Sequence, residues 1–431
     1  MKRIYIIFII LILFSVSCGK QEFVSEPDET VPVETLVPRE DIPLTRAQTD
    51  YINKGGNTFA LNLFKAVAKE EDVVISPLGV TFALGMADNG AYENTNTKAE
   101  IERVLGYEED SVDGLNSFCG TMMGNSVKID PSTRIAFANA AVFNSHVISP
   151  TFGYRPPRKE FINVVEANYD ASILTNDFEN DDVKNIVNSW CDKKTDGMIP
   201  GFLKDQPDAN SYVLFLNALY FKGIWSSQFK KSDTKKEDFR NISNKKVTVN
   251  MMRQEAYFNY GGINGLCSAV CLPYGNQAYR MILLLPLKGQ TIGSLKEALD
   301  IDKWNDINTS LHREKVNVKI PSFEIEYYSS LKQSLQTLGI YEAFNPLYAH
   351  FELMCERGGV WIDDVVQKAK IIVDEQGSEA AAITEVKFGT YTGTSGGSNQ
   401  TVEFHADRPF IYAITEVSTG AIFFIGQYTG K

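Results

Sequence analysis

The spacing of apolar residues along the chain changes near residue 205. Before this point, apolar residues recur mostly at i, i+3 and i+4, the spacing that places them on one face of a helix. This pattern predicts helices at 57–69, 76–91, 97–105 and 181–194. Apolar runs predict strands at 73–75 and 134–143, whereas residues 108–133 have no clear pattern and are expected to be irregular.

After residue 205 the apolar segments are short and rich in β-branched and aromatic residues, which is typical of strands. One helix, at 330–338, interrupts them and ends at Gly339. Helices that precede strands, mostly without βαβ alternation, predict an α+β fold. The expected strands lie at 213–225, 246–252, 268–273, 280–286, 316–327, 370–374, 401–405, 410–415 and 421–426.

The first seventeen residues are typical of a signal peptide. Lys2 and Arg3 precede an apolar run at 4–14, and the small residues Ser15 and Ser17 come after it. The run is shorter than the ~20 residues that a membrane-spanning helix needs. We therefore expect residues 1–17 to direct export and to be removed.

Cys18 leaves two alternatives for the mature N-terminus. An ordinary signal peptidase would cut after Ser17 and release a secreted protein. The segment also resembles a bacterial lipobox, although the usual leucine three residues before the cysteine is absent. We favour this second alternative, which implies an acylated Cys18 and a lipid anchor at the bacterial cell envelope, at the outer membrane or the cell surface. Residues 18–45, rich in proline and acidic residues, would then be a disordered tether ahead of one domain at 46–431.

Composition argues against some classes of partner and some kinds of site. The net charge is −12 and no basic run stands out, so nucleic acid is not an expected partner. Five cysteines remain after Cys18, and at least one must be unpaired. Cys267 and Cys271 would lie ~13 Å apart along a strand, too far for a disulfide. No second Cys or His pair completes a zinc site, so we expect buried thiols, no metal and no cofactor. The five are Cys119, Cys191, Cys267, Cys271 and Cys355.

Catalytic motifs are not found. Residues 393–397 superficially imitate the nucleophile loop of chymotrypsin-like peptidases, but a Gly/Ser/Thr-rich mobile loop explains them better. None of the four histidines (146, 312, 350 and 405) stands in a context that indicates a general base. Asp363 and Asp364 are expected to be solvated. We therefore predict that the protein is not an enzyme.

The segment 375–384 is unusual because its sequence is compatible with a strand and equally with a helix or coil. A predicted strand runs straight into Gly377, Ser378 and three alanines, and one alternating face of residues 378–388 is uncharged and mostly small. Such a segment suits a chain that leaves a loop and enters a sheet. An ordinary exposed helix or linker would explain it as well.

This segment resembles the hinge of the serpin family, which has the form Glu-Glu-Gly-Thr-Glu-Ala-Ala-Ala-x-Thr, with Gln376 and Ser378 as mild departures. The resemblance extends over nearly the whole chain from residue 50. Its further motifs, in family order, are Asn57-Thr58-Phe59-Ala60, Ser76-Pro77-Leu78, Asn139-Ala140, Asn188-Ser189-Trp190 with Thr195, Gly197 and Ile199, the stretch 217–225, Met251-Met252, Leu272-Pro273-Tyr274, Leu285-Pro286, Pro321-Ser322-Phe323, Leu338-Gly339-Ile340, Arg408-Pro409-Phe410 and Phe424-Ile425-Gly426.

The resemblance implies a single domain with a large central sheet, two smaller sheets, about eight or nine helices and an exposed reactive-centre loop at 375–404. It also implies a mechanism in which a peptidase cuts this loop, forms an acyl-enzyme and is dragged away as the hinge inserts as a new strand; serpins are a standard example of such insertion. Sixteen residues, 376–391, would span ~53 Å as a strand. The implied hinge residues are Glu375, Gly377, Ser378, Glu379, Ala380, Ala381, Ala382 and Thr384.

Two departures from the family pattern concern a latch over the point where the central sheet opens. The resemblance assigns this latch to Ser76, Asn217 and residue 367, and the breach above it to Trp225. The family has a second serine where this chain has Gly79, and a histidine where it has Gln367. Gln367 can still donate and accept hydrogen bonds, so we expect a latch of altered strength.

The resemblance places the reactive bond between Tyr391 and Thr392, fourteen residues after Gly377. Tyrosine suits a chymotrypsin-like peptidase, whereas cutting at Lys387 or Phe388 would leave a shorter inserted strand. The expected partner is a serine peptidase, or alternatively a cysteine peptidase, held in a covalent complex with a serpin monomer.

No glycosaminoglycan is expected, because residues 108–128 are acidic to neutral. The rival function is that of a non-inhibitory serpin, a binding or chaperone-like protein. Members of that kind tend to carry bulky or charged residues where this chain has Gly377, Ser378, Ala380 and Ala382.

Overall fold

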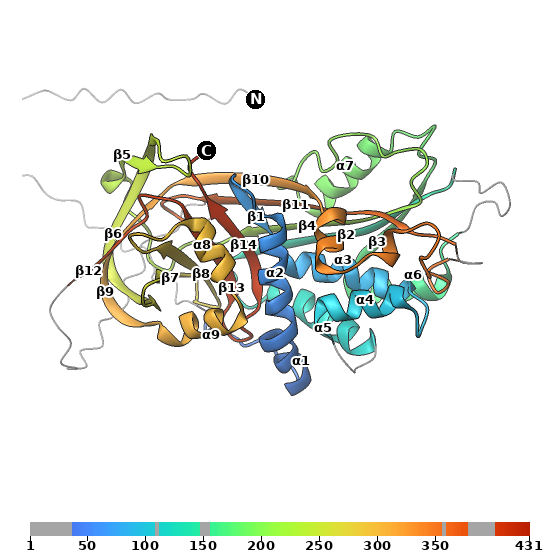
Figure 1. The fold of residues 1–431 in the computed structure, drawn as a ribbon, viewed down its shortest axis with the longest axis horizontal. Coiled ribbons are helices and arrows are strands. Elements are labelled where there is room, and N and C mark those ends of the chain that lie inside the picture. The colour runs from blue at the N-terminus through green and yellow to red at the C-terminus, as the bar shows by residue number, and fades with distance from the viewer. Residues whose placement is uncertain (1–36, 108–111, 147–155, 356–358, 378–400) are drawn as a thin grey trace, which may run out of the picture. The chain divides into compact units, whose positions relative to one another are not determined.

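The computed structural model describes residues 37–107, 112–146, 156–355, 359–377 and 401–431, and these residues build two sheets that helices cover (Figure 1). The five-stranded sheet has the order β10-β11-β4-β2-β3. Its strands are β10 (Phe323–Ser330), β11 (Ile362–Val373), β4 (Val213–Lys222), β2 (Arg134–Asn144) and β3 (Ala171–Asn176).

The nine-stranded sheet has the order β1-β14-β13-β8-β7-β6-β9-β12, with β5 paired to β6. One long strand, β6, pairs with β7 through 259–263 and with β9 through 251–260. The two smaller sheets that the family resemblance implies are therefore joined through β6. The strands are β1 (Val73–Ile75), β5 (Lys235–Arg240), β6 (Lys246–Ile263), β7 (Cys267–Tyr274), β8 (Tyr279–Pro286), β9 (His312–Pro321), β12 (Val402–His405), β13 (Phe410–Glu416) and β14 (Ile422–Tyr428).

The helices lie mostly in the first half of the chain, and the predicted α+β class is confirmed. A π-helical turn, Ile52–Gly56, joins the first two helices, and short 3-10 turns occur at Lys231–Asp233 and Glu342–Phe344. The helices are α1 (Arg46–Tyr51), α2 (Asn57–Val67), α3 (Pro77–Gly90), α4 (Asn96–Leu105), α5 (Val112–Ser126), α6 (Lys159–Tyr169), α7 (Val183–Lys194), α8 (Ile292–Ala298), α9 (Ile301–Ser310) and α10 (Lys332–Leu338).

Strand β4 is buried on both faces, which explains its almost continuous apolar sequence. Alternate residues point to opposite sides of a strand. Val213, Phe215 and Leu219 belong to the main core, whereas Leu214 and Leu216 pack in a second cluster with residues of α7. By the same alternation, Asn217 points into the main core.

Two predictions from the sequence are wrong about local structure. Residues 108–133 include a helix, α5, whose Leu115, Phe118, Cys119 and Met122 are buried. Its glycines, serines and asparagines are poor helix formers and obscure the apolar face in the sequence. The predicted strand 316–327 is two strands in different sheets, because the chain changes sheet at Ser322.

The predicted tether also ends too late. Ile42 is buried in the main core and its N–H donates to Ser418 Oγ at 3.0 Å. Thr45 caps α1, and its side chain and that of Gln48 exchange hydrogen bonds with each other's backbone N–H. The segment from Ile42 therefore packs with the domain, whereas residues 1–36, with Cys18, lie outside the described residues.

Candidate functional site

The candidate site is the seam between β11 and β4, the two central neighbours of the five-stranded sheet (Figure 1). These strands run parallel, and their ladder extends from the Ile362–Val213 pair to the Lys370–Tyr220 pair. Their outer neighbours, β10 and β2, are antiparallel to them. A strand that turned back after β11 and entered the seam would be antiparallel to both neighbours and could form a regular ladder with each.

Gln367 joins three elements at the middle of this seam. From β11, its Oε1 accepts from Ser76 N–H at 2.8 Å, and its Nε2 donates to Ser76 O at 2.8 Å and to Asn217 Oδ1 at 2.9 Å. All three residues are fully buried. Ser76 also caps α3, where its Oγ accepts from Gly79 N–H. The predicted latch residues therefore form one hydrogen-bonded cluster.

The cluster continues across the sheet to a residue for which the sequence alone indicates no role. Asn139 of β2 lies directly opposite Asn217 and accepts from its Nδ2 at 2.8 Å. Asn139 Nδ2 donates in turn to Tyr169 O at 2.8 Å. A buried, fully connected polar chain of this kind fixes the register of the strands that it joins.

Gly79 leaves space for these hydrogen-bonded side chains. A Cβ atom added at Gly79 would lie 2.0 Å from Asn217 Oδ1, well inside contact distance. The two departures from the family pattern are thus neighbours in space. The glycine leaves space for the Asn217 amide, and Gln367 binds that amide.

A second set of hydrogen bonds joins β11 and β4 at the far end of the seam, through Asp363. The expectation that Asp363 is solvated is therefore wrong. Asp363 is half-buried, and its carboxylate accepts from the backbone N–H groups of Tyr212 and Val213 and from Trp361 Nε1. Burial raises the pKa of Asp363. Asp364, also half-buried, accepts from Lys332 N–H. The donors come from neighbouring segments of the fold, so the sequence pattern could not reveal them.

The hinge begins where β11 ends, beyond the last pair with β4. Phe229 N–H donates to Glu375 O at 2.8 Å, and Trp225 N–H donates to Gln376 O at 2.9 Å. The Glu375 carboxylate accepts from Thr234 Oγ1 at 2.7 Å. The start of the hinge is therefore held against the segment that comes after β4.

Trp225 covers this end of the seam, at the position that the sequence predicts as the breach. Its ring is almost fully buried and stacks on Tyr274 with ring centroids 4.3 Å apart. Its Nε1 donates to Asp374 O at 2.9 Å. Trp225 thus links the end of β11 to the nine-stranded sheet through both its ring and its N–H.

Gly377 is required by the local backbone. Its φ is +147°, and an added Cβ would lie 2.1 Å from Gly223 O and 2.7 Å from Ile224 Cα. A side chain here would be strained and would collide with the backbone that comes after β4.

The remaining predicted site residues lie outside the described residues. They are Ser378, Glu379, Ala380, Ala381, Ala382, Thr384, Tyr391, Thr392 and Cys18. The described part of the site thus consists of the latch, the breach and the first hinge residues. Asn139, Thr234 and Asp363 also belong to it, although no pattern in the sequence assigns them to the site.

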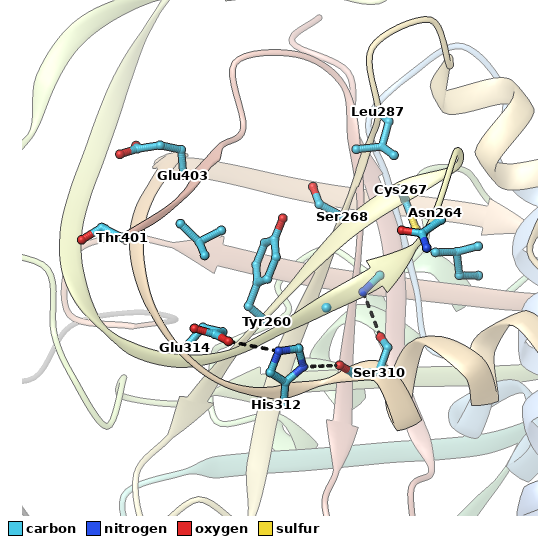
Figure 2. Close-up of a pocket in the computed structure, with 14 residues that line it drawn as sticks. Tyr260, Asn264, Cys267, Ser268, Leu287, Ser310, His312, Glu314, Thr401 and Glu403 are labelled. Carbon is cyan, nitrogen blue, oxygen red and sulfur yellow. Dashed lines mark hydrogen bonds and ion pairs between the residues drawn. The ribbon is translucent and has the colours of Figure 1, made fainter. Parts of the chain in front are cut away.

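A separate pocket of about 690 Å³ lies where β6, α9, β9 and β12 meet (Figure 2). His312 lies within 2.8 Å of Ser310 O and 3.1 Å of Glu314 Oε1 (Figure 2). The Ser310 hydroxyl donates to Ile307 O and accepts from Gly262 N–H. Burial raises the pKa of the Cys267 thiol, which lowers its reactivity. This pocket therefore pairs neither Ser310 nor Cys267 with an activating base.

The cysteines at positions 119, 191, 267, 271 and 355 are buried thiols, as the sequence predicts. Within the described ranges, no group of three His, Cys, Asp or Glu side chains is arranged to hold a metal ion. None of the helices in those ranges has both the length and the apolar character needed to cross a membrane.

Comparisons with known proteins agree with this architecture. The family model described as "Serpin (serine protease inhibitor)" matches residues 54–430. Iripin-1 from Ixodes ricinus is 32% identical over 391 residues, which cover 89% of this chain and 95% of that protein. Leukocyte elastase inhibitor from Homo sapiens is 28% identical over 393 residues, covering 88% and 99%.

The solved structures are similar as well. The native state of tengpin, a thermophilic serpin, matches with a TM-score of 0.78 and 26% identity, and the match covers 92% of this chain and 97% of that one. Both the sequence match and the structural match span nearly the whole domain. This chain belongs to the serpin family.

Proposed function

We propose that this protein inhibits serine peptidases by acting as a substrate that traps them. The peptidase's serine hydroxyl would attack the carbonyl carbon of Tyr391, break the bond to Thr392 and leave Tyr391 as an acyl ester on the peptidase. The amine of Thr392 would leave with a proton. The segment after Gly377 would then enter the seam between β11 and β4 and carry the peptidase with it.

The observation that carries this proposal is the parallel pairing of β11 and β4 next to a restrained hinge. Insertion replaces one parallel ladder by two antiparallel ladders, so the sheet gains hydrogen bonds overall. β11 has twelve residues, ~40 Å of strand, whereas 376–391 would span ~53 Å. The cleaved end would therefore reach the far end of the seam, near Ile362.

The latch explains why insertion would wait for cleavage. Opening the seam breaks the bonds from Gln367 to Asn217 or to Ser76, and each buried group left without a partner costs about 1–3 kcal/mol. Such a barrier would keep the uncleaved form in a metastable state. The Trp225 and Phe229 contacts would add to it at the hinge.

The target class is inferred from Tyr391, which suits the apolar primary pocket of a chymotrypsin-like peptidase. Incubation with a panel of serine and cysteine peptidases should yield a complex that survives boiling in detergent. The small fragment released from it should begin at Thr392 by mass spectrometry. Tyr391→Arg should move inhibition toward trypsin-like peptidases; a fragment that begins after Lys387 or Phe388 would reassign the bond.

Ala382→Arg tests insertion separately from cleavage. An arginine forced into the sheet would be buried without a partner, which costs several kcal/mol. This variant should be cleaved at the same bond but should release an active peptidase. If the unmodified protein is cleaved without trapping any peptidase of the panel, the non-inhibitory alternative, a binding or chaperone-like serpin, is correct.

We also propose that the inhibitor is a monomer, anchored by lipid at Cys18 to the bacterial cell envelope. The support is the short apolar run at 4–14 with a cysteine shortly after it. Secretion after a cut at Ser17 is the alternative.

A further inference from the structure

A basic surface adjoins the hinge of this acidic protein. Residues 230–246 contain seven Lys or Arg against three Asp or Glu, a net charge of +4 in a chain of −12. The segment comprises a 3-10 turn at Lys231–Asp233, strand β5, and the start of β6, and β5 is labelled at the upper left of Figure 1. Along the sequence the acids interrupt the cations, and no basic run is evident.

The fold pairs two of the three acids, one with a cation outside the segment and one with a cation inside it. Glu237 pairs with Lys319 of β9 at 2.8 Å, and Asp238 pairs with Lys246 at 2.6 Å. Asp233 alone then opposes the remaining cations. Within the described residues, six exposed cations of the segment form no ion pair: Lys230, Lys231, Lys235, Lys236, Arg240 and Lys245.

The register of the hairpin places two of these cations on its exposed face, together with Asp238. Phe239 of β5 is buried, so Lys236 and Arg240, which alternate with it, point to the opposite, exposed face. Arg240 lies directly opposite Lys246 on β6. Asp238 pairs with Lys246 there, so Lys236 and Arg240 are the unpaired cations of this face among the described residues.

The basic surface contacts the hinge directly. Thr234 lies between Asp233 and Lys235, and its hydroxyl donates to Glu375. The backbone of Phe229, next to Lys230, holds the same residue through Glu375 O. The start of the hinge therefore lies beside this basic segment.

We propose that residues 230–246 are an interaction surface that attracts target peptidases with an acidic surface. This inference rests on the proposed function and adds a partner class to it, because Tyr391 would select the primary pocket whereas these lysines would select the charge around it. Complementary charge acts mainly on the association rate, and salt screens it.

The test uses two variants in which two lysines are replaced by glutamate. The 235/236 variant, Lys235→Glu/Lys236→Glu, changes the basic surface. The matched control, the 54/193 variant, is Lys54→Glu/Lys193→Glu, at exposed positions on the turn after α1 and on α7. The probe is one chymotrypsin-like peptidase, used as it is and after succinylation of its lysines. At low ionic strength we expect the unmodified inhibitor to associate roughly tenfold faster with the succinylated peptidase, and 0.5 M salt (about a 4 Å screening length) to abolish this preference. The 235/236 variant should lose the preference, and the 54/193 variant should retain it.

The stoichiometry of the covalent complex separates the two proposals. Equal stoichiometry in all variants shows that trapping is intact, so a difference in rate is attributable to the surface charge. A preference that persists in the 235/236 variant, or that salt does not diminish, overturns the inference and leaves the trapping mechanism standing. The 235/236 variant could instead associate with the peptidase as fast as the unmodified inhibitor but lose its retention on a sulfated polysaccharide column. This result would assign the surface to polyanions and would equally overturn the peptidase proposal.

Discussion

Gln367 and Asn217 face each other across the only parallel contact of β11 in the described sheet, and one hydrogen bond of 2.9 Å joins their side chains. The same Gln367 amide also satisfies the N–H and C=O of Ser76, at the start of α3. One uncharged side chain therefore ties a helix to both strands of the seam. Neither of these side chains titrates, so we expect this part of the latch to be insensitive to pH.

Gln367→Ala should weaken the uncleaved protein more than an ordinary surface change. It leaves the buried N–H and C=O of Ser76 and Oδ1 of Asn217 without this partner, at about 1–3 kcal/mol for each unsatisfied group. The thermal unfolding midpoint should fall, and inhibitory capacity should decay faster during incubation at elevated temperature. Gln333→Ala, on the exposed side of α10, is the control; an equal change in both variants would show that the latch contributes nothing.

Gly79→Ser, which restores the family residue, should destabilise this particular chain. The new Cβ would lie 2.0 Å from Asn217 Oδ1, so the amide must move and its bond with Gln367 must break. Overpacking of this kind costs about 1–3 kcal/mol. Gly124→Ser, on α5 with nothing within 4 Å of the added atom, is the matched helical control. A Gly79→Ser protein with an unchanged unfolding midpoint would contradict the compensation between Gly79 and Gln367.

Gly377→Ala should release the start of the hinge from the segment after β4. The methyl group would lie 2.1 Å from Gly223 O, and the φ of +147° is unfavourable for alanine. We expect faster cleavage near residue 377 in limited proteolysis and a loss of roughly 2 kcal/mol or more, since strain and collision add. Gly420→Ala shares the positive φ but meets no atom within 4 Å, and it isolates the collision. Equal effects of the two substitutions would argue against a restrained hinge.

Asp88 should make stability depend on pH. Burial raises its pKa to about 7 because the charged form loses hydration, which nearby Lys98 offsets only in part, while Glu93 and Glu102 add to the rise. Between about pH 4 and pH 7 the folded protein therefore holds a proton that the unfolded chain has lost. This contribution to stability is complete below about pH 4 and is lost as the pH rises through 7, at about 1.4 kcal/mol for each unit of pKa shift.

Asp88→Asn should remove this pH dependence. Unfolding midpoints, measured at one scan rate between pH 4 and pH 8, should change less with pH in the variant than in the unmodified protein. Asp192→Asn, at an exposed position of α7, is the control and should behave like the unmodified protein. An undiminished pH dependence in Asp88→Asn would assign it to other carboxylates.

Cys18→Ser should release the protein from membranes and abolish labelling with a radiolabelled fatty acid, because the thiol is the acylation site in the proposal. A single acyl chain binds a membrane only weakly, so stable anchoring would depend on the diacylglyceryl group together with a further amide-linked chain. If the unmodified protein never incorporates label and is found in the medium, secretion is the correct alternative.

Local sequence patterns were sufficient to predict the helices and strands whose apolar spacing is regular. α2 begins at Asn57 as predicted, and α4 ends at Leu105, followed by Gly106, whose left-handed conformation suits glycine. These features depend on neighbours a few residues apart, and a local pattern contains them. The motifs of the family resemblance also brought Ser76, Asn217 and Gln367 together before any geometry was known.

Elements without a regular local pattern required the structure. β3, β5, α6, α8 and α9 were not predicted, and neither was the change of sheet at Ser322. Whether an extended segment continues in one sheet or enters another depends on which strand supplies its hydrogen bonds. Those partners are distant in the sequence, as β6 is from β9.

The way in which the site residues act on one another is visible only in the folded chain. Gly79 could be identified as a departure from the family pattern, but only the fold places it against Asn217 Oδ1. Asp363 looked like a solvated acid until the N–H groups of Tyr212 and Val213 were found to bind it. Glu237 pairs with Lys319 of β9, a residue 82 positions away in the sequence, rather than with the lysines beside it. Charge, burial and hydrogen bonding are properties of atoms close in space, and the chain brings these atoms together only when it folds.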